Sequence, residues 1–227
     1  MLVGAGNTRR GLAHVALLTA VLTGCAEGSD DAPSGHASAS SSATADAAGG
    51  SDKVAESGGT IGKPGSACEL PVTFDIAADW KAKSIDAEAA GDGSDLADEI
   101  ADALLHQGPV TGACEVDAKP AGHIGFLRVW TGKPGKDDAR TVLEAFVKAE
   151  DNTSKPKYTT FRSGGLDGVE VEYLYTSKLL EETKKERALA VTTASGPVVL
   201  HLGGLDTEEH EDMLPAFELA KQTLRTA

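Results

Sequence analysis

The chain of 227 residues carries 21 basic and 35 acidic residues, which gives a formal net charge of −14 with neutral histidines. An acidic surface of this kind disfavours nucleic acid and anionic lipid headgroups as partners. The length falls short of two typical domains, so the sequence predicts one folded domain of ordinary size.

The first residues have the plan of a secretory signal. Arg9 and Arg10 precede an apolar run over residues 12–22 that is interrupted by His14 and Thr19. A positive start, a short apolar stretch and a small-residue exit are typical of a cleaved export signal. The run is too short to cross a membrane as a helix, so any anchor must be covalent.

The run ends in Leu22, Thr23, Gly24 and Cys25, and these four residues are similar to the lipobox of bacterial lipoproteins. The resemblance implies a diacylglyceryl group on the thiol of Cys25 and cleavage after residue 24. The mature protein would then be held by its lipid anchor on the extracytoplasmic face of the cell membrane. The alternative is an ordinary cleaved signal that happens to be followed by a cysteine.

The two arginines leave the export route open. Arg9 and Arg10 resemble the pair of a twin-arginine signal, which carries already folded proteins across the membrane. Two ordinary charges in front of a Sec-type signal fit the same residues.

The segment after Cys25 has a biased composition. Residues 26–66 are mostly Ala, Ser, Gly and Asp, with few apolar side chains. Such a segment cannot bury enough surface to offset its loss of chain entropy. We therefore expect a signal peptide over residues 1–24, a lipidated, disordered tether over 25–66, and a single globular domain over 67–227. The tether should span roughly 35 Å.

Cys68 and Cys114 remain once Cys25 is assigned to the lipobox. Disulfides persist outside the cytoplasm, and two remaining cysteines allow one pairing. We predict a disulfide between them that stabilises the fold by about 3–4 kcal/mol. Neither cysteine has a His or Cys neighbour at ligand spacing, so no metal site and no cofactor are expected.

The first half of the domain shows clear periodic patterns. Alternating apolar residues indicate strands, and an apolar stripe at helical spacing indicates each helix. The first two strands should form a hairpin through the turn at residues 78–80. The predicted elements are strands at 71–77 and 81–85, a helix at 94–107, strands at 114–118 and 123–131, and a helix at 137–150.

The second half contains four strands and a helix. The alternation of Val169, Val171, Tyr173 and Tyr175 with polar residues indicates a half-buried strand, and Tyr173 and Tyr175 should belong to the core. A proline is tolerated only in the first turn of a helix, so the last helix should begin near residue 214, after a short turn. The predicted strands are 158–162, 169–176, 187–193 and 197–203, and the final helix ends by 226.

This order of elements predicts the α+β class. Consecutive strands joined by short turns favour a mainly antiparallel sheet, and the helices should pack on its faces.

Several of these segments resemble PsbP-like domains. Residues 74–80 are similar to the phenylalanine, proline and tryptophan signature that opens those domains, with Ala78 where a proline is usual. The Gly-Leu-Asp-Gly turn at 165–168 and the segment around Leu214 are also similar. The resemblance points to the actinobacterial branch, the LpqN-type lipoprotein family. It implies an α/β/α sandwich, and it implies a binding or assembly factor because members of this fold act mainly in that way.

The sequence offers little support for chemistry. An acidic cluster could hold calcium, but apolar residues occupy required ligand positions, so we expect a solvated helix face instead. Ser163 precedes glycines without a nucleophile motif, and the histidines show no ligand pair. The cluster is Asp92, Asp95, Asp98, Glu99 and Asp102, and the exported histidines are His36, His106, His123, His201 and His210.

Three functions fit this sequence. The first is a non-catalytic binding or assembly module of the cell envelope, whose partner is an unidentified envelope protein or small ligand. The second is a regulatory lipoprotein that modulates an envelope-stress signalling system. The third is an envelope hydrolase, which would require a concave site that joins His201 or His123 to a carboxylate and a hydroxyl.

Overall fold

The structure, a computed structural model, describes residues 53–86 and 105–227. The export signal, the lipobox with Cys25, His36 and the acidic cluster from Asp92 to Asp102 lie outside these residues. The described residues belong to one unit of the chain, which comprises residues 48–227.

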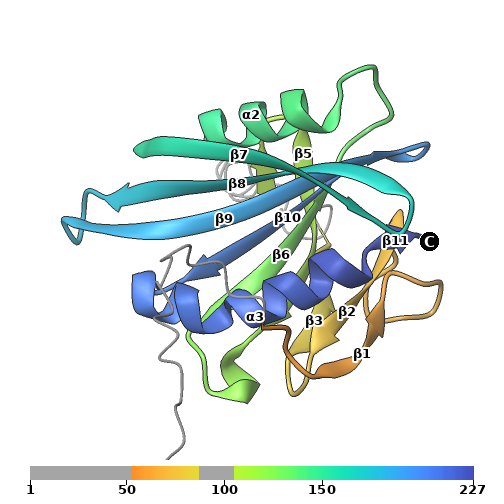
Figure 1. The fold of residues 1–227 in the computed structure, drawn as a ribbon, viewed down its shortest axis with the longest axis horizontal. Helices are drawn as coiled ribbons and strands as arrows, with labels where there is room; N and C mark the ends of the chain where they lie inside the picture. Colours follow the sequence, from red (N-terminus) through yellow and green to blue (C-terminus); the bar gives the residue numbers. More distant parts are fainter. Residues whose placement is uncertain (1–52, 87–104) are drawn as a thin grey trace, which may run out of the picture. The chain divides into compact units, whose positions relative to one another are not determined.

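A large antiparallel sheet forms the centre of this unit (Figure 1). Its strand order is β3-β5-β6-β10-β9-β8-β7, and β4 pairs with β5 beside β3. The strands are β3 (Lys81–Ser84), β4 (His106–Gln107), β5 (Val110–Asp117), β6 (Gly125–Thr131), β7 (Thr153–Ser163), β8 (Leu166–Ser177), β9 (Glu182–Thr193) and β10 (Gly196–Gly204).

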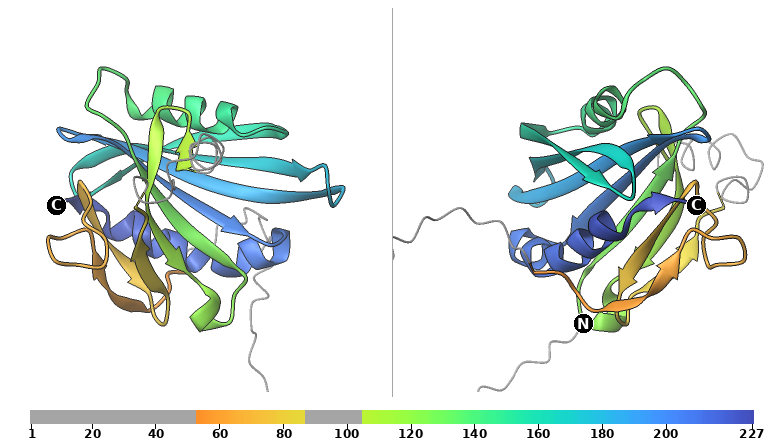
Figure 2. Two further views of the ribbon diagram at one scale, coloured as in Figure 1. Left: turned by 180° about the vertical axis from the view of Figure 1, so that it is seen from behind. Right: turned by 45° about the vertical axis from the view of Figure 1, so that its right-hand side comes forward.

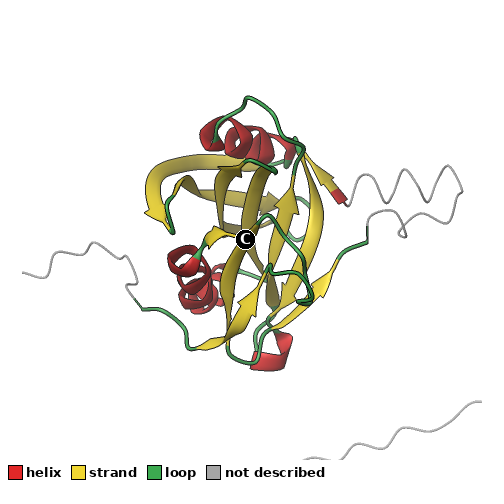
Figure 3. Ribbon diagram, turned by 90° about the vertical axis from the view of Figure 1, so that its right-hand side faces the viewer, coloured by secondary structure: helices red, strands yellow, loops and turns green. Residues whose placement is uncertain are grey.

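Two described helices cover opposite faces of this sheet, α2 (Ala139–Ala149) and α3 (Thr207–Thr223), as Figure 3 shows. α2 begins at Asp138, whose carboxylate accepts a hydrogen bond from the N–H of Thr141. Its apolar stripe packs on the sheet in one core cluster, while α3 packs in the other. The predicted sheet with helices on its faces is confirmed, and the predicted α2 stripe is buried: Ala139, Val142, Leu143, Phe146 and Val147.

A second, three-stranded sheet lies on the α3 side of the large sheet (Figure 2). Its order is β1 (Ser57–Ile61), β2 (Val72–Ala77) and β11 (Arg225–Thr226). Phe74 of β2, Leu200 of β10 and Phe217 of α3 are all buried in the same core cluster. This cluster therefore joins the small sheet, α3 and the large sheet.

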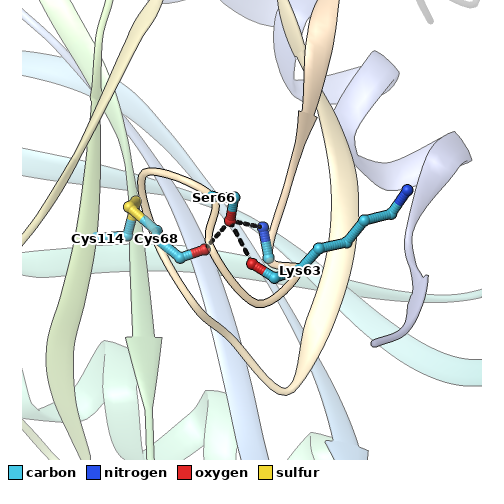
Figure 4. Close-up of a disulfide and its surroundings, with 5 residues drawn as sticks. Lys63, Ser66, Cys68 and Cys114 are labelled. Atoms are coloured by element: carbon cyan, nitrogen blue, oxygen red, sulfur yellow. Dashed lines mark hydrogen bonds between the residues drawn. A yellow bond between two sulfur atoms is a disulfide. The ribbon is translucent and has the colours of Figure 1, made fainter.

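A disulfide joins Cys68 to Cys114 (Figure 4). Cys68 lies in the connection between β1 and β2, and Cys114 lies in β5, so the bond links the small sheet to the large one. Ser66 fixes the loop beside it, because its Oγ lies 2.6 Å from the carbonyl oxygen of Cys68 and 2.7 Å from that of Lys63. The predicted disulfide is thus present.

The predicted tether extends too far. β1 lies within residues 26–66, and Ile61 of β1 is buried opposite Phe74. Its glycines permit a close approach to β2, since a Cβ at Gly58 would lie 2.7 Å from the carbonyl oxygen of Ala77. The expectation of a tether was wrong for residues 57–66, because composition alone does not reveal tertiary pairing.

The predicted leading hairpin is also wrong. β2 pairs with β1 and β11, whereas β3 pairs with β5. Asp79, between β2 and β3, has a left-handed φ of 65°, and Trp80 is buried in the core. The turn therefore carries the chain from one sheet into the other.

Two predicted helix boundaries are wrong: the end of the helix at 94–107 and the start of the last helix near residue 214. Residues 94–104 of the predicted helix at 94–107 lie outside the described residues, and His106–Gln107 form β4. α3 starts at Thr207 and continues through Pro215, because Asp206 caps it and the buried Met213 anchors its first half. The helix thus includes a proline in its interior that was expected only in a first turn.

Candidate functional site

The β8–β9 hairpin extends beyond the end of β10. β9 pairs with β8 as far as Glu182, which lies opposite Ser177. Its pairing with β10 stops at Arg187, which lies opposite Leu202. In the part of the chain that the structure describes, no strand lies beside β9 on this side beyond Arg187. Figure 1 shows the hairpin projecting past β10 at the left of the picture.

β10 ends where the chain turns into α3, and this corner is tied to β9 by two hydrogen bonds. The backbone N–H of Lys185 donates to Thr207 Oγ1 at 3.1 Å, and Lys184 Nζ donates to the carbonyl oxygen of Gly204 at 2.6 Å. Gly204 packs closely against α3, since a Cβ there would lie 2.9 Å from Met213 Cε and 3.2 Å from the backbone nitrogen of His210. The corner is therefore held at a fixed distance from β9.

A pocket of about 580 Å³ lies between the hairpin and this corner. Its volume is within the range of about 300–1,000 Å³ that is usual for ligand sites. Tyr175, Leu180 and Leu205 form its apolar wall. The acidic side chains at the pocket are Glu182, Asp206 and Glu208.

Exposed apolar side chains lie in the wall of the pocket and next to it. Leu179 and Leu180 in the β8–β9 turn are 90% and 60% exposed, and Leu205 at the α3 corner is 53% exposed. Ile124 before β6 is 54% exposed and lies beside Leu205, whose N–H donates to its carbonyl oxygen at 3.0 Å. We name these four residues the apolar end. Contiguous exposed apolar groups are typical of interaction surfaces.

A chain of buried polar groups runs from the pocket to the end of α2. Lys184 Nζ lies 2.8 Å from Glu186 Oε1, and Glu186 Oε2 lies 2.9 Å from His201 Nε2. The hydroxyl of Tyr173 lies 3.2 Å from the same His201 nitrogen and donates to Glu150 Oε2 at 2.7 Å. We call these five residues the polar chain.

The two carboxylates of the polar chain have opposite pKa shifts. Burial raises the pKa of Glu186, but the hydrogen bond from His201 and the charge of Lys184 outweigh burial, so this pKa lies below its usual value. Burial raises the pKa of Glu150, and its partners only partly offset this. Burial and the nearby carboxylates raise the pKa of Tyr173 well above its usual value.

The structure therefore brings His201 together with a carboxylate and a hydroxyl, as the hydrolase hypothesis required. These groups are buried, however, and the wall of the pocket does not include His201, Glu186 or Tyr173. His201 itself is 8% exposed and lies within the polar chain. Tyr173 belongs to the core as predicted, whereas Tyr175 is half-buried at the pocket.

The other candidate residues are accounted for by local structure. His123 Nδ1 lies 2.8 Å from Glu209 Oε1 on the first turns of α3. The Ser163 hydroxyl is buried and lies 3.0 Å from the carbonyl oxygens of Gln222 and Leu224. Among residues 53–86 and 105–227, no three His, Cys, Asp or Glu side chains are placed to hold a metal ion.

Two further pockets have less to offer a partner. One, of about 740 Å³, lies at the start of α2. The charged side chains in its wall are already paired with one another or with groups of α2. Arg162 pairs with Asp167 at 3.3 Å, and Asp138 caps α2. The other is smaller, at about 190 Å³, and is lined partly by Trp80 and His123.

Residues 38–224 match the model of a family described as uncharacterised lipoprotein. The chain belongs to this family. It is accordingly a lipoprotein associated with the cell envelope. A search of curated proteins found no match. Among solved structures, the lipoprotein is similar to cyanobacterial PsbP (CyanoP) from Synechocystis sp. PCC 6803, with 11% identity and a TM-score of 0.48. That likeness covers 78% of this chain and 96% of the other.

Sequence reasoning missed the apolar end of the lipoprotein. Leu179 and Leu180 lie in the connection between two predicted strands, and two adjacent leucines among lysines and glutamates are a signal for an exposed apolar tip. The pocket itself has no sequence signature, since it arises from the different lengths of two strand pairings. No described helix is long and apolar enough to span a membrane.

His210 of α3 lies directly beneath the corner that forms one wall of the pocket. It is 1% exposed, and its Nδ1 has no hydrogen-bond partner among the described residues. Burial lowers the pKa of its imidazole to about 4. The folded lipoprotein therefore keeps His210 neutral at a pH where the unfolded chain already binds a proton.

We predict that the free energy of unfolding falls through this group as the pH drops from about 6.5 to about 4, by about 3 kcal/mol. The sign follows because the unfolded state gains the proton first. Chemical unfolding of the wild-type protein and of His210→Leu at several pH values measures the effect. The stability difference between the two proteins should change over this interval, and a constant difference would contradict the assignment.

Proposed function

We propose that the lipoprotein is a non-catalytic binding module, anchored through Cys25 to the extracytoplasmic face of the cell membrane, that binds an envelope protein at the apolar end. The observation that carries the proposal is a pocket whose wall includes the exposed Leu180 and Leu205, each with a further exposed apolar residue next to it, Leu179 and Ile124. Covering a surface of this composition with a partner is favourable, because it removes apolar area from water.

The energetics of the apolar end support this reading. Covering one exposed Leu or Ile side chain is worth about 1.5–3 kcal/mol. Leu179 and Leu180 occupy the tip of a hairpin where polar turn residues would serve the fold equally well. The stability of this domain therefore does not explain why two leucines are exposed here, whereas binding of a partner does.

The burial of the polar chain supports a non-catalytic role. A hydrolytic nucleophile must reach its substrate and lose its proton readily. Tyr173 is 1% exposed, and its raised pKa disfavours the phenolate. Phe146 of α2 packs edge-on against His201 with ring centroids 5.7 Å apart, so the imidazole is enclosed from that side. These groups fit a structural network between α2 and the sheet.

The residues at 74–80 and the segment around Leu214 support a narrower placement in the LpqN-type branch of actinobacterial lipoproteins. The binding or assembly role that this resemblance implies agrees with the apolar end. The match to a lipoprotein family supports the lipid on Cys25 and the membrane location.

Photo-crosslinking tests the binding site directly. A photoreactive amino acid at Leu180 or Leu205, introduced into the full-length protein in its native cells, should give a discrete adduct with an envelope protein. The same residue at Asp137, an exposed position before α2, serves as the matched control and should give none. Equal adducts at all three positions, or no adduct at either leucine, would contradict the proposal.

Replacement of Cys25 tests the anchor. Cys25→Ala removes the thiol that would carry the lipid, so the protein should no longer float with membrane vesicles in a density gradient. The disulfide partners Cys68 and Cys114 are unchanged, so the domain should remain folded by circular dichroism. A Cys25→Ala protein that is folded and lacks the signal peptide, yet remains with the vesicles, would rule out the lipid anchor.

A further inference from the structure

We propose that the partner contributes an extended, basic peptide segment, which binds in the pocket as a short strand along β9 and pairs with the backbone of Thr183. This inference rests on the proposed function and specifies the chemistry of the partner. Three features carry it: the direction of the free backbone groups of β9, the charge around the pocket, and the contrast with the other long edge of the sheet.

The register of β9 fixes where its backbone groups point. In an antiparallel ladder, alternate residues direct their N–H and C=O groups to opposite sides of the strand. Arg187 faces β10, and the N–H of Lys185 points to the same side because it donates to Thr207. Thr183 is two residues further along and therefore directs its N–H and C=O toward the same side, where the described chain provides no strand.

The pocket lies along this free piece of β9. Thr183 is part of its wall, together with Leu180 on the hairpin turn and Leu205 on the opposite side. A strand that pairs with Thr183 would place alternate side chains against the apolar wall and toward solvent. Strand addition of this kind draws affinity from backbone hydrogen bonds and specificity from pockets for alternate side chains.

The charges around the pocket favour a basic peptide. Glu182 and Glu208 at the pocket form no salt bridge with any cation of the described chain. Lys184 is already bound by Glu186 and by the carbonyl oxygen of Gly204. A second copy of this chain would bring two sets of these acidic side chains together, and they would also repel an anionic lipid surface. In a peptide with arginine or lysine beside apolar residues, the apolar residues match the wall of the pocket and the basic residues match Glu182 and Glu208.

The sheet's other long edge is protected against strand addition, whereas β9 is not. β7 carries Pro156 between Lys155 and Lys157, and its register shifts in this region. Lysine, proline and bulges are the usual means of protecting an edge. The lysines of the free piece of β9 are engaged instead, since Lys184 pairs with Glu186 and Lys185 with Glu211 at 2.6 Å.

Fluorescence anisotropy of short labelled peptides tests the inference on the full-length lipidated protein in a non-ionic detergent. The probe is a peptide in which valine alternates with arginine. We expect saturable binding that weakens with salt. A peptide with glutamate in place of arginine should not bind, and a peptide with alternate backbone nitrogens methylated should bind about tenfold or more weakly, since it cannot complete the ladder.

Matched variants locate the binding. Thr183→Pro removes the free N–H and no backbone bond to β8, so it should weaken binding about tenfold. Thr183→Val loses the same hydroxyl, which lies 2.9 Å from Thr176 Oγ1 of β8, but it keeps the N–H and should bind normally. Glu182→Gln with Glu208→Gln should weaken binding and reduce its salt dependence, and Asp137→Asn should change neither. Thermal unfolding of each variant identifies any that fail to fold, and the methylated peptide tests the backbone pairing in the wild-type protein.

The outcomes separate the inference from the proposed function. If the methylated and unmethylated peptides bind equally, or if folded Thr183→Pro binds like the wild type, strand addition is wrong. If, in addition, crosslinks at Leu180 and Leu205 persist, the apolar end binds a partner of another kind and the proposed function stands. If the arginine peptide does not bind at all, a basic segment is excluded.

Discussion

The position of α3 across the large sheet depends on a group of charged side chains around the buried Glu170. Arg187 of β9 reaches Glu170 at 3.2 Å, Glu172 at 2.8 Å and Glu218 of α3 at 3.6 Å, while Lys221 of α3 contacts Glu170 and Glu218 at 2.7 Å each. Removing Arg187 or Lys221 would destabilise the fold, because the buried carboxylate of Glu170 would lose a compensating charge. These contacts fix α3 against β8 and β9, and so they fix the corner where β10 must leave the sheet. β9 and β8 continue past that corner, and the space they leave beside β9 is the pocket.

The two faces of this sheet serve different purposes. The charged group under α3 sets the direction of the chain after β10, whereas the polar chain under α2 connects Lys184 at the pocket to Glu150 at the end of α2. Most of these side chains are buried or half-buried, and within each group they are bonded to one another. At the end of the sheet the apolar end is exposed, Glu182 and Glu208 form no salt bridge with the described residues, and no described strand pairs with Thr183 on its β10 side. A binding function at this end therefore requires no rearrangement of the rigid core.

Local periodicity was enough to predict much of this fold. The α2 stripe and the alternation in β8 depend on neighbours in the sequence, and both appear as predicted. The pairing of β1 with β2, the transfer of β3 to the other sheet and the passage of α3 through Pro215 depend on contacts between distant residues, so no local pattern contained them. Glu170 and Glu172 were placed on the polar side of their strand, yet Glu170 is buried because Arg187 and Lys221 compensate it. The candidate site was missed for the same reason, since it follows from the relative lengths of the β9 pairings with β8 and with β10.

The central claim is that the end of the β8–β9 hairpin is the binding surface of the membrane-anchored protein. Amide hydrogen exchange, followed by mass spectrometry, should compare the lipoprotein in its native membrane vesicles with the purified protein in detergent. The account predicts slower exchange in vesicles for the peptides that contain Thr183 and Leu205, with little change over α2. Unchanged exchange at this end, together with protection elsewhere on the domain, would contradict it.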